Sequence, residues 1–262
     1  SPGRMPTVVI DNTVSREERV ELTLKKLVAN IAVFSTYFKN HGQNVRFLLN
    51  IGSDDKEIRN RYYQLAIAEI RKTNPDRKLY LTASGIDRLP ELSIPKDDLN
   101  LIVAAEMAQS TEGKADAIDV FAWQFQDYFF TDKMPQIKFP GVIPKLDESM
   151  VTDLGRWALK FSNTKIEKNY FDNKFKKANQ WMKQNHPKLE IYIPHFRYWT
   201  GYPFDPNSVK DQKSVNNFIS SFAEAAKKHK INWCFYDYNS GSGIRYPNGN
   251  KAFILEALRL EK

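Results

Sequence analysis

Several features that mark particular classes of protein are scarce or missing in this 262-residue sequence. It holds a single cysteine, Cys234, which excludes an intramolecular disulfide and any cysteine-rich zinc site. No uninterrupted apolar run reaches the ~18 residues of a transmembrane helix, so no membrane span is predicted. The histidines are scattered, and their spacing from Asp and Glu suggests no metal site.

The N-terminus lacks the basic segment followed by an apolar one that marks a secretory signal. Residues 1–5, Ser-Pro-Gly-Arg-Met, are expected to be a cloning remnant, with the natural N-terminus cut away. The localisation is therefore unknown from this end of the chain.

Positive charge is in excess, with 39 Lys and Arg against 31 Asp and Glu and a formal net charge of +8. Runs such as Lys174–Lys177 and Lys227–Lys230 are typical of solvated helix faces. The alternative is attraction to a polyanion, either a nucleic acid or an acidic polysaccharide. Because no nucleic-acid-binding module accompanies the charge, a nucleic-acid partner is not expected.

Two hydrophobic periodicities alternate along the chain, and this pattern predicts an α/β fold with a parallel sheet. Short apolar, β-branched runs predict six buried strands, at residues 7–10, 45–49, 78–82, 100–104, 190–193 and 231–236. Helices are predicted at residues 17–40, 56–73, 149–161, 167–185 and 208–229.

A single domain over residues 1–262 is the better interpretation, because no low-complexity linker or shift in composition marks a boundary. A long excursion, residues 106–188, interrupts the regular spacing of the strands. The first strand is followed by Asp11–Ser15 without a glycine, whereas a nucleotide-binding sheet usually has a glycine-rich turn there. Nucleotide binding is therefore not predicted.

Five segments, in order, resemble motifs of glycoside hydrolase family 5, the cellulase-type (β/α)8 barrels. Tyr63–Lys78 is similar to the family's A-I-R-x-x-N-P-x-R stretch, and Leu92–Val103 to its L-x-x-P-x-D-x-N-L-I-V entry to a strand. Phe139–Gly141 matches F-P-G, Trp233–Ile244 resembles the W-A-Y-W-D-x-x-S-G-F-G-I of the last strand, and Glu256–Leu258 fits the closing helix. The resemblance covers nearly the whole chain and implies a TIM-barrel-like fold.

The N-terminal part departs from the family. Thr7–Asp11 aligns with the family's third strand, so the first two barrel strands have no counterpart here. The expected fold is therefore a truncated or rearranged barrel with about six strands. Open strand edges favour pairing with another chain, so self-association or a protein partner is expected.

The catalytic positions depart as well. Retaining glycosidases need two carboxyl groups about 5–5.5 Å apart. The resemblance places the family's acid, the Glu of Asn-Glu-Pro, at Ile51 after the matching Asn50, and its nucleophile at His195. Isoleucine cannot transfer a proton, and histidine lacks the negative charge that stabilises an oxocarbenium-like centre. The resemblance also places other residues of the active-site mouth at Thr13, Val14, Glu106, Ala108 and Tyr236, and this pattern indicates a non-catalytic descendant.

The residues expected at the carboxyl ends of the strands are the candidate ligand-binding residues, because barrel sites lie there. They are Asn50, Glu106, His195, Arg197, Tyr198, Trp199, Tyr236 and Asp237. Arg197 and its aromatic neighbours suit a sugar face or an acidic sugar, and they equally suit a protein interface. His195 has the alternative of being a core histidine.

A relocated catalytic pair is the main rival hypothesis, with Glu106 acting beside Asp237 or Asp54. In the simpler interpretation Asp237 holds neighbouring loops, and Asp54 and Asp55 cap the next helix. The aromatic residues Trp123, Phe125, Tyr128, Phe129 and Phe130 form local core or lid rather than a ligand platform, and Cys234 is expected to be a buried structural thiol.

The sequence therefore predicts a catalytically inactive glycoside-hydrolase-like protein that binds a polysaccharide, possibly anionic, or a partner protein. The alternatives are an active β-glycosidase and an interaction subunit without sugar affinity. No cofactor or metal is predicted. A secreted or periplasmic location is what the resemblance implies.

Overall fold

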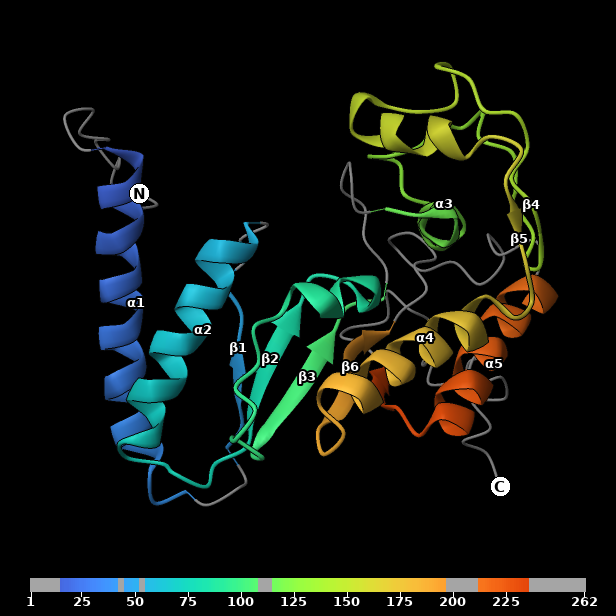
Figure 1. Cartoon of the computed structure of the whole chain (residues 1–262). Coiled ribbons are helices and arrows are strands. Elements are labelled where there is room, and N and C mark those ends of the chain that lie inside the picture. Colours follow the sequence, from blue (N-terminus) through green and yellow to red (C-terminus); the bar gives the residue numbers. More distant parts are fainter. Residues whose placement is uncertain (1–14, 42–44, 52–54, 108–114, 197–211, 236–262) are drawn as a thin grey trace, which may run out of the picture. The chain divides into compact units, whose positions relative to one another are not determined.

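The computed structural model describes residues 15–41, 45–51, 55–107, 115–196 and 212–235 (Figure 1). The chain divides into two compact units, and the boundary in the sequence lies between Leu79 and Tyr80. Each unit is described by itself. The strand predicted at residues 7–10 lies outside the described residues, and the single domain stays a prediction.

The first unit contains the helices α1 (Arg16–Phe38) and α2 (Lys56–Arg71) and the strand β1 (Phe47–Leu49). Ser15 caps α1 and forms a reciprocal capping box with Glu18, which explains why the helix begins at this point. Asp55 caps α2 by accepting hydrogen bonds from the backbone N–H groups of Glu57 and Ile58. The predicted capping role is confirmed for Asp55, whereas Asp54 lies outside the described residues.

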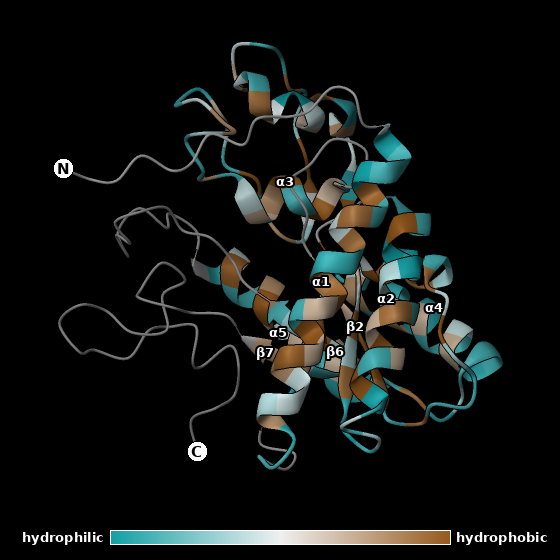
Figure 2. Cartoon of the chain, turned by 90° about the vertical axis from the view of Figure 1, so that its left-hand side faces the viewer, coloured by the Kyte–Doolittle hydropathy of each residue, from teal (hydrophilic) through white to brown (hydrophobic). Residues whose placement is uncertain are grey.

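One face of α1 is apolar and exposed. Leu24 and Ser35 are buried, but four large apolar side chains remain more than half exposed, at Leu22, Val33, Phe34 and Tyr37. Figure 2 shows both hydrophobic and hydrophilic residues along this helix. A helix usually buries such side chains against another surface.

A buried polar network ties the end of α1, the start of β1 and the end of α2 together. The Arg77 guanidinium, 4% exposed, donates to the carbonyl oxygens of Phe38 and Val45 and to Oδ1 of Asn74, at 2.7, 2.5 and 2.9 Å. Nδ2 of Asn74 donates in turn to the carbonyl and hydroxyl oxygens of Ser35, both at 2.7 Å. Asn74 and Arg77 of the N-P-x-R part of the sequence motif therefore stabilise the fold of this unit.

In the second unit, the strands lie in the order β2-β3-β6-β7, where β2 is Leu79–Ala83, β3 is Leu101–Ala105, β6 is Glu190–Phe196 and β7 is Asn232–Phe235. The pairs β3-β6 and β6-β7 are parallel. All residues of β2 and β3 are buried, as expected for strands covered on both faces. The predicted parallel α/β architecture is confirmed.

The helices α4 (Tyr170–Asn185) and α5 (Gln212–His229) lie side by side along one face of this sheet (Figure 1). An aromatic layer joins them to β6, with ring centroids of Phe171 and Phe222 5.3 Å apart and those of Phe196 and Phe222 3.5 Å apart. Phe218 completes the layer, 5.3 Å from Phe171. These rings form the core behind the carboxyl end of β6.

The excursion between β3 and β6 holds several short elements. They are α3 (Ala117–Trp123), the antiparallel pair β4 (Gly141–Val142) and β5 (Lys165–Ile166), and the 3₁₀ helix η3 (Asp153–Phe161); a further 3₁₀ helix, η2 (Ile86–Glu91), follows β2.

The α-helix predicted from residue 149 is thus a 3₁₀ helix that begins at Asp153. A close approach of two backbones accompanies this difference, because a Cβ added at Gly155 would lie 1.8 Å from the Phe129 carbonyl oxygen. The Thr152 N–H donates to that same oxygen, at 2.9 Å.

Cys234 is exposed, so the expectation of a buried thiol was wrong. It lies in β7, the last strand of the order, next to Trp233. Successive side chains of a strand point to opposite faces, and the Trp233 ring takes the side packed against Phe222, with ring centroids 5.2 Å apart. Cys234 therefore lies on the opposite face.

Candidate functional site

The carboxyl ends of β3 and β6 bring two of the predicted site residues to neighbouring positions. In the register of this pair, Ala104 lies opposite Tyr192. Continuing the register by two residues places Glu106 beside Pro194, one residue before His195. Glu106 and His195 thus lie at the same edge of the sheet, at the ends of two neighbouring strands.

Glu106 is held in place by its backbone. Its N–H donates to the carbonyl oxygen of Ala83, at 3.4 Å, and its carbonyl oxygen accepts from the N–H of Ile86, at 3.1 Å. Its side chain is half-buried. Alternation along β3 places it on the same face as Ile102 and Ala104, which pack with Tyr80 and Tyr192. The Glu106 carboxylate therefore shares one face of the sheet with these apolar and aromatic side chains.

His195 is exposed, so it is not the core histidine of the alternative interpretation. The pairing of β6 with β7 is irregular between Ile193 and Phe196, and both of these side chains are buried. Such a bulge changes the direction of the side chains around it. It allows Phe196 to join the aromatic layer while His195 stays accessible at the strand end.

In the first unit, Asn50 and Ile51 follow β1 directly. Asn50 is exposed, and Ile51 is half-buried. Ile51 lines a cavity of about 200 Å³ together with the apolar residues Val20, Leu24 and Ile58 and the polar residues Arg16, Arg19 and Thr23. The position that the resemblance assigns to the general acid therefore holds an apolar residue in the lining of this cavity.

Six predicted site residues lie outside the described residues: Asp54, Arg197, Tyr198, Trp199, Tyr236 and Asp237. Their roles stay predictions. Among the residues that the structure does describe, no group of His, Cys, Asp and Glu could hold a metal ion. Likewise, none of the described helices combines the length and hydrophobicity that a bilayer span requires.

Most of the aromatic band in the excursion is core. Trp123, Phe129 and Phe130 are buried, and Trp157 of η3 packs against the latter two, with ring centroids 5.9 and 6.1 Å away. Tyr128 is 46% exposed. The prediction of local core holds for the three buried rings.

A cluster that the sequence does not reveal surrounds Lys174 of α4. Its ammonium group contacts the carboxylates of Asp87 and of Asp116, the latter at 2.5 Å, and the Tyr170 hydroxyl donates to Asp116. Burial lowers the pKa of Lys174, but the two carboxylates outweigh it, so the pKa lies above its usual value. Burial, followed by the charge of Asp116, raises the pKa of Tyr170 well above its usual value. The cluster ties α4 to η2 and to the N-cap of α3.

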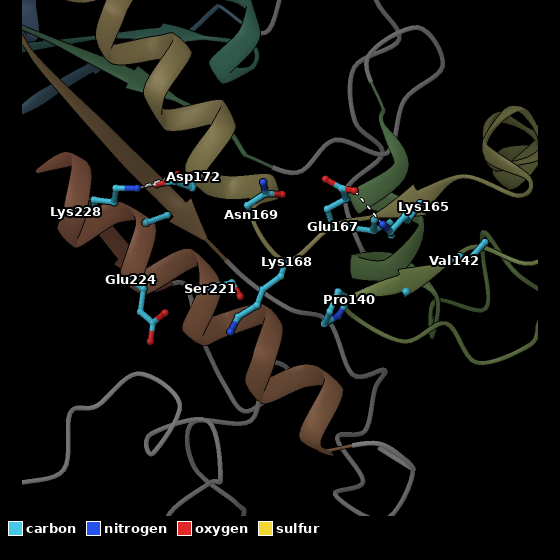
Figure 3. Close-up of a pocket in the computed structure, with 13 residues that line it drawn as sticks. Pro140, Val142, Lys165, Glu167, Lys168, Asn169, Asp172, Ser221, Glu224 and Lys228 are labelled. Atoms are coloured by element: carbon cyan, nitrogen blue, oxygen red, sulfur yellow. Dashed lines mark hydrogen bonds and ion pairs between the residues drawn. The ribbon is translucent and has the colours of Figure 1, made fainter.

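A cavity of about 730 Å³ lies between α5, the start of α4 and the β4-β5 pair (Figure 3). Its charged side chains are mostly paired with one another, Lys228 with Asp172 at 2.8 Å and Lys165 with Glu167 at 3.0 Å. Lys168 extends toward α5 in the same view. None of the predicted site residues lines this cavity.

The same fold occurs in several solved structures. A cellulose synthase subunit, CcsZ from Clostridioides difficile, is 21% identical over 93% of this chain and 71% of its own, with a TM-score of 0.64. Endoglucanase Cel5A from Thermotoga maritima is 18% identical over 91% and 67%, with a TM-score of 0.64. A xyloglucanase of glycoside hydrolase family 5 from Bacteroides ovatus is 11% identical over 92% and 51%, with a TM-score of 0.62.

No protein-family model and no curated protein sequence matches the chain. At these low identities the structural similarity establishes the fold. The fold implied by the sequence motifs is thereby confirmed: this chain has the TIM-barrel-type fold of the family 5 cellulases.

Proposed function

We propose that this protein is a catalytically inactive relative of the family 5 glycoside hydrolases that binds a polysaccharide at the carboxyl edge of its sheet. The observation that carries the proposal is Ile51, an apolar residue that lines a cavity where the resemblance places the general acid. Without a proton donor there, a leaving sugar oxygen would not be protonated.

His195 supports the same conclusion from the other unit. The resemblance places it at the position of the nucleophile, and an imidazole provides no negative charge for an oxocarbenium-like transition state. It can still exchange hydrogen bonds with sugar hydroxyl groups, as can the carboxylate of Glu106 on the neighbouring strand. The edge thus keeps groups suited to binding while it lacks the catalytic pair.

The names of the similar structures indicate which sugar to test. They include an endo-β-1,4-glucanase in complex with substrate and Cel5A in complex with cellobiose. A β-1,4-glucan is therefore the first candidate ligand, and cellohexaose is a suitable probe.

The test measures cellohexaose binding by calorimetry and the release of reducing ends from β-glucans at high protein concentration. We expect binding without release, and we expect His195→Ala to weaken binding by about tenfold, the loss of one strong hydrogen bond. His186→Ala is the matched control, because His186 precedes the opposite, N-terminal end of β6.

Two outcomes would overturn the proposal. Release of reducing ends that Glu106→Gln abolishes would show an active glycosidase with relocated carboxylates. Absence of binding at millimolar cellohexaose and β-glucan would favour the interaction subunit.

A second candidate function, protein interaction, is favoured by the exposed apolar face of α1. Val33 and Tyr37 are each 69% exposed, and exposed apolar patches commonly mark interaction sites. Light scattering should then show an oligomer that Phe34→Ser with Tyr37→Ser converts to a monomer. A monodisperse monomer of the unmodified protein would contradict self-association.

A further inference from the structure

A second cavity, of about 380 Å³, lies in the excursion just after α3. The residues of interest in its lining are Phe125, Gln126, Asp127, Asp132, Met134 and Gln136. Its size is at the lower end of small-molecule sites and suits one or two sugar rings. None of these residues belongs to the strand-end site.

Gln126 is the most informative residue of this cavity. The residue is 3% exposed, no described residue forms a hydrogen bond with its side chain, and its amide is accessible from the cavity rather than fully enclosed. Gln124, two positions earlier, is equally buried but fully satisfied, because its amide donates to the Phe121 and Ile137 carbonyls and accepts from the Ile137 N–H at 2.7 Å. The open amide of Gln126 lines the cavity and suits a ligand that both donates and accepts hydrogen bonds.

The charge of the cavity is negative in a chain with a net charge of +8. Asp127 and Asp132 are exposed, and no described residue forms an ion pair with either of them. None of the described lining residues is a Lys or Arg. Two carboxylates without a cation favour a positively charged ligand.

An apolar surface accompanies these polar groups. Phe125 is half-buried and Met134 lies in the same lining. An aromatic ring can stack on the C–H face of a sugar and can attract an ammonium group. A bare metal ion would use neither this surface nor the amide donor.

We infer that this cavity binds a cationic sugar unit, a hexosamine with a protonated amine, through Gln126, Asp127, Asp132 and Phe125. The carboxylates bind the ammonium group and adjacent hydroxyls, the amide binds a further hydroxyl, and the ring of Phe125 covers one face of the sugar. The inference does not depend on the proposed function, since the two sites share no residue.

The experiment compares calorimetric binding of the β-1,4-linked glucosamine trisaccharide, cellotriose and the tri-N-acetylated trisaccharide, with a chelator present. We expect the glucosamine trisaccharide to bind at least about tenfold more tightly than the two neutral sugars. Its affinity should fall as the pH rises through the titration of the sugar amine and as salt is added.

Two variants in the cavity and two controls outside it locate the site. Asp132→Asn should weaken binding of the glucosamine trisaccharide by about tenfold, whereas Asp97→Asn, an exposed carboxylate outside the cavity, should leave it unchanged. Gln126→Leu should lose affinity without losing stability, because its amide has no internal partner. His195→Ala should not affect this binding, which separates the cavity from the strand-end site.

The inference is overturned if the three trisaccharides bind equally, or if Asp132→Asn and Asp97→Asn behave alike. It is also overturned if Ca²⁺ alone, without the chelator, binds in an Asp132-dependent manner while no trisaccharide does, because the cavity would then be a cation site.

Discussion

Arg77 offers the sharpest test of how the first unit is held together. Its guanidinium supplies three hydrogen bonds, to Phe38 O, Val45 O and Asn74 Oδ1, and it lies 5.3 Å from the centre of the Phe47 ring. Arg77→Met keeps much of the apolar stem but removes every donor. Three acceptors then lose their Arg77 donor in a largely buried position.

The expected cost follows from the number of acceptors. The Phe38 carbonyl oxygen keeps the His41 N–H, at 3.0 Å, so Val45 O and Asn74 Oδ1 are the two acceptors left unsatisfied. An unsatisfied buried acceptor costs about 1–3 kcal/mol, so the two together cost at least about 2 kcal/mol. Arg77→Lys keeps the charge, but a single ammonium group cannot span three separate acceptors, and we expect an intermediate loss. Arg61→Met is the control, because Arg61 makes a surface ion pair with Glu21 at 2.8 Å, with a side chain 56% exposed, and should cost no more than about 1 kcal/mol.

Hydrogen exchange of the amides of α1 and α2 measures this loss where it occurs. Tryptophan fluorescence does not report on it locally, since all five tryptophans follow residue 79. Arg77→Met should increase amide exchange throughout both helices, whereas Arg61→Met should not. Equal and small effects of the two substitutions would refute the idea that the Arg77 network fixes these helices.

Three further predictions concern the second unit. Gly155→Ala should destabilise the protein by about 1–3 kcal/mol in thermal melting, because the new methyl group would lie 1.8 Å from the Phe129 carbonyl oxygen; an unchanged melting temperature would contradict this close approach. Hydrogen bonds from Lys228 and His229 hold the pKa of Asp172 below its usual value, so its contribution to stability is present at neutral pH and is lost as the pH falls through that lowered pKa. The difference in stability between the unmodified protein and Asp172→Asn should therefore shrink in acid, and a difference that is constant with pH would argue against the ion pair. Lys174→Met should destabilise by about 1–3 kcal/mol because it leaves Asp87 and Asp116 without their shared cation, and adding Asp87→Asn should recover part of the loss in urea unfolding.

The elements that sequence patterns predicted well are those with local signals. The α2 helix begins at Lys56, as predicted, because Asp55 caps it, and it ends at Arg71, shortly before Pro75. The strands β2 and β3 lie within one residue of the predicted ranges, because apolar runs of five residues can be buried on both faces. Hydrophobic periodicity and capping residues are enough to predict the bounds of these three elements.

The elements that the sequence did not reveal depend on contacts between distant residues. The 3₁₀ geometry of η3 accompanies the approach of Gly155 to Phe129, and the Lys174 cluster joins residues 58 and 87 positions apart. No local pattern encodes either contact. The same reason limits the prediction of the site. Glu106 and His195 could be named as candidates from the sequence, but only the pairing of β3 with β6 shows that their strand ends lie side by side.

The matching motifs and the replaced positions play different physical roles. Asn74 and Arg77 hold backbone carbonyls, Asp98 accepts from the Asn100 N–H at 3.0 Å at the entry to β3, and the Phe139 N–H donates to Ser214. All of these contacts are internal and stabilise the fold whether or not a substrate is bound. Ile51 and His195, in contrast, are the residues that the resemblance places where the family carries groups that serve the reaction. The shared scaffold therefore establishes the fold, and the activity is tested by the proposed assays, since a fold does not by itself determine an activity.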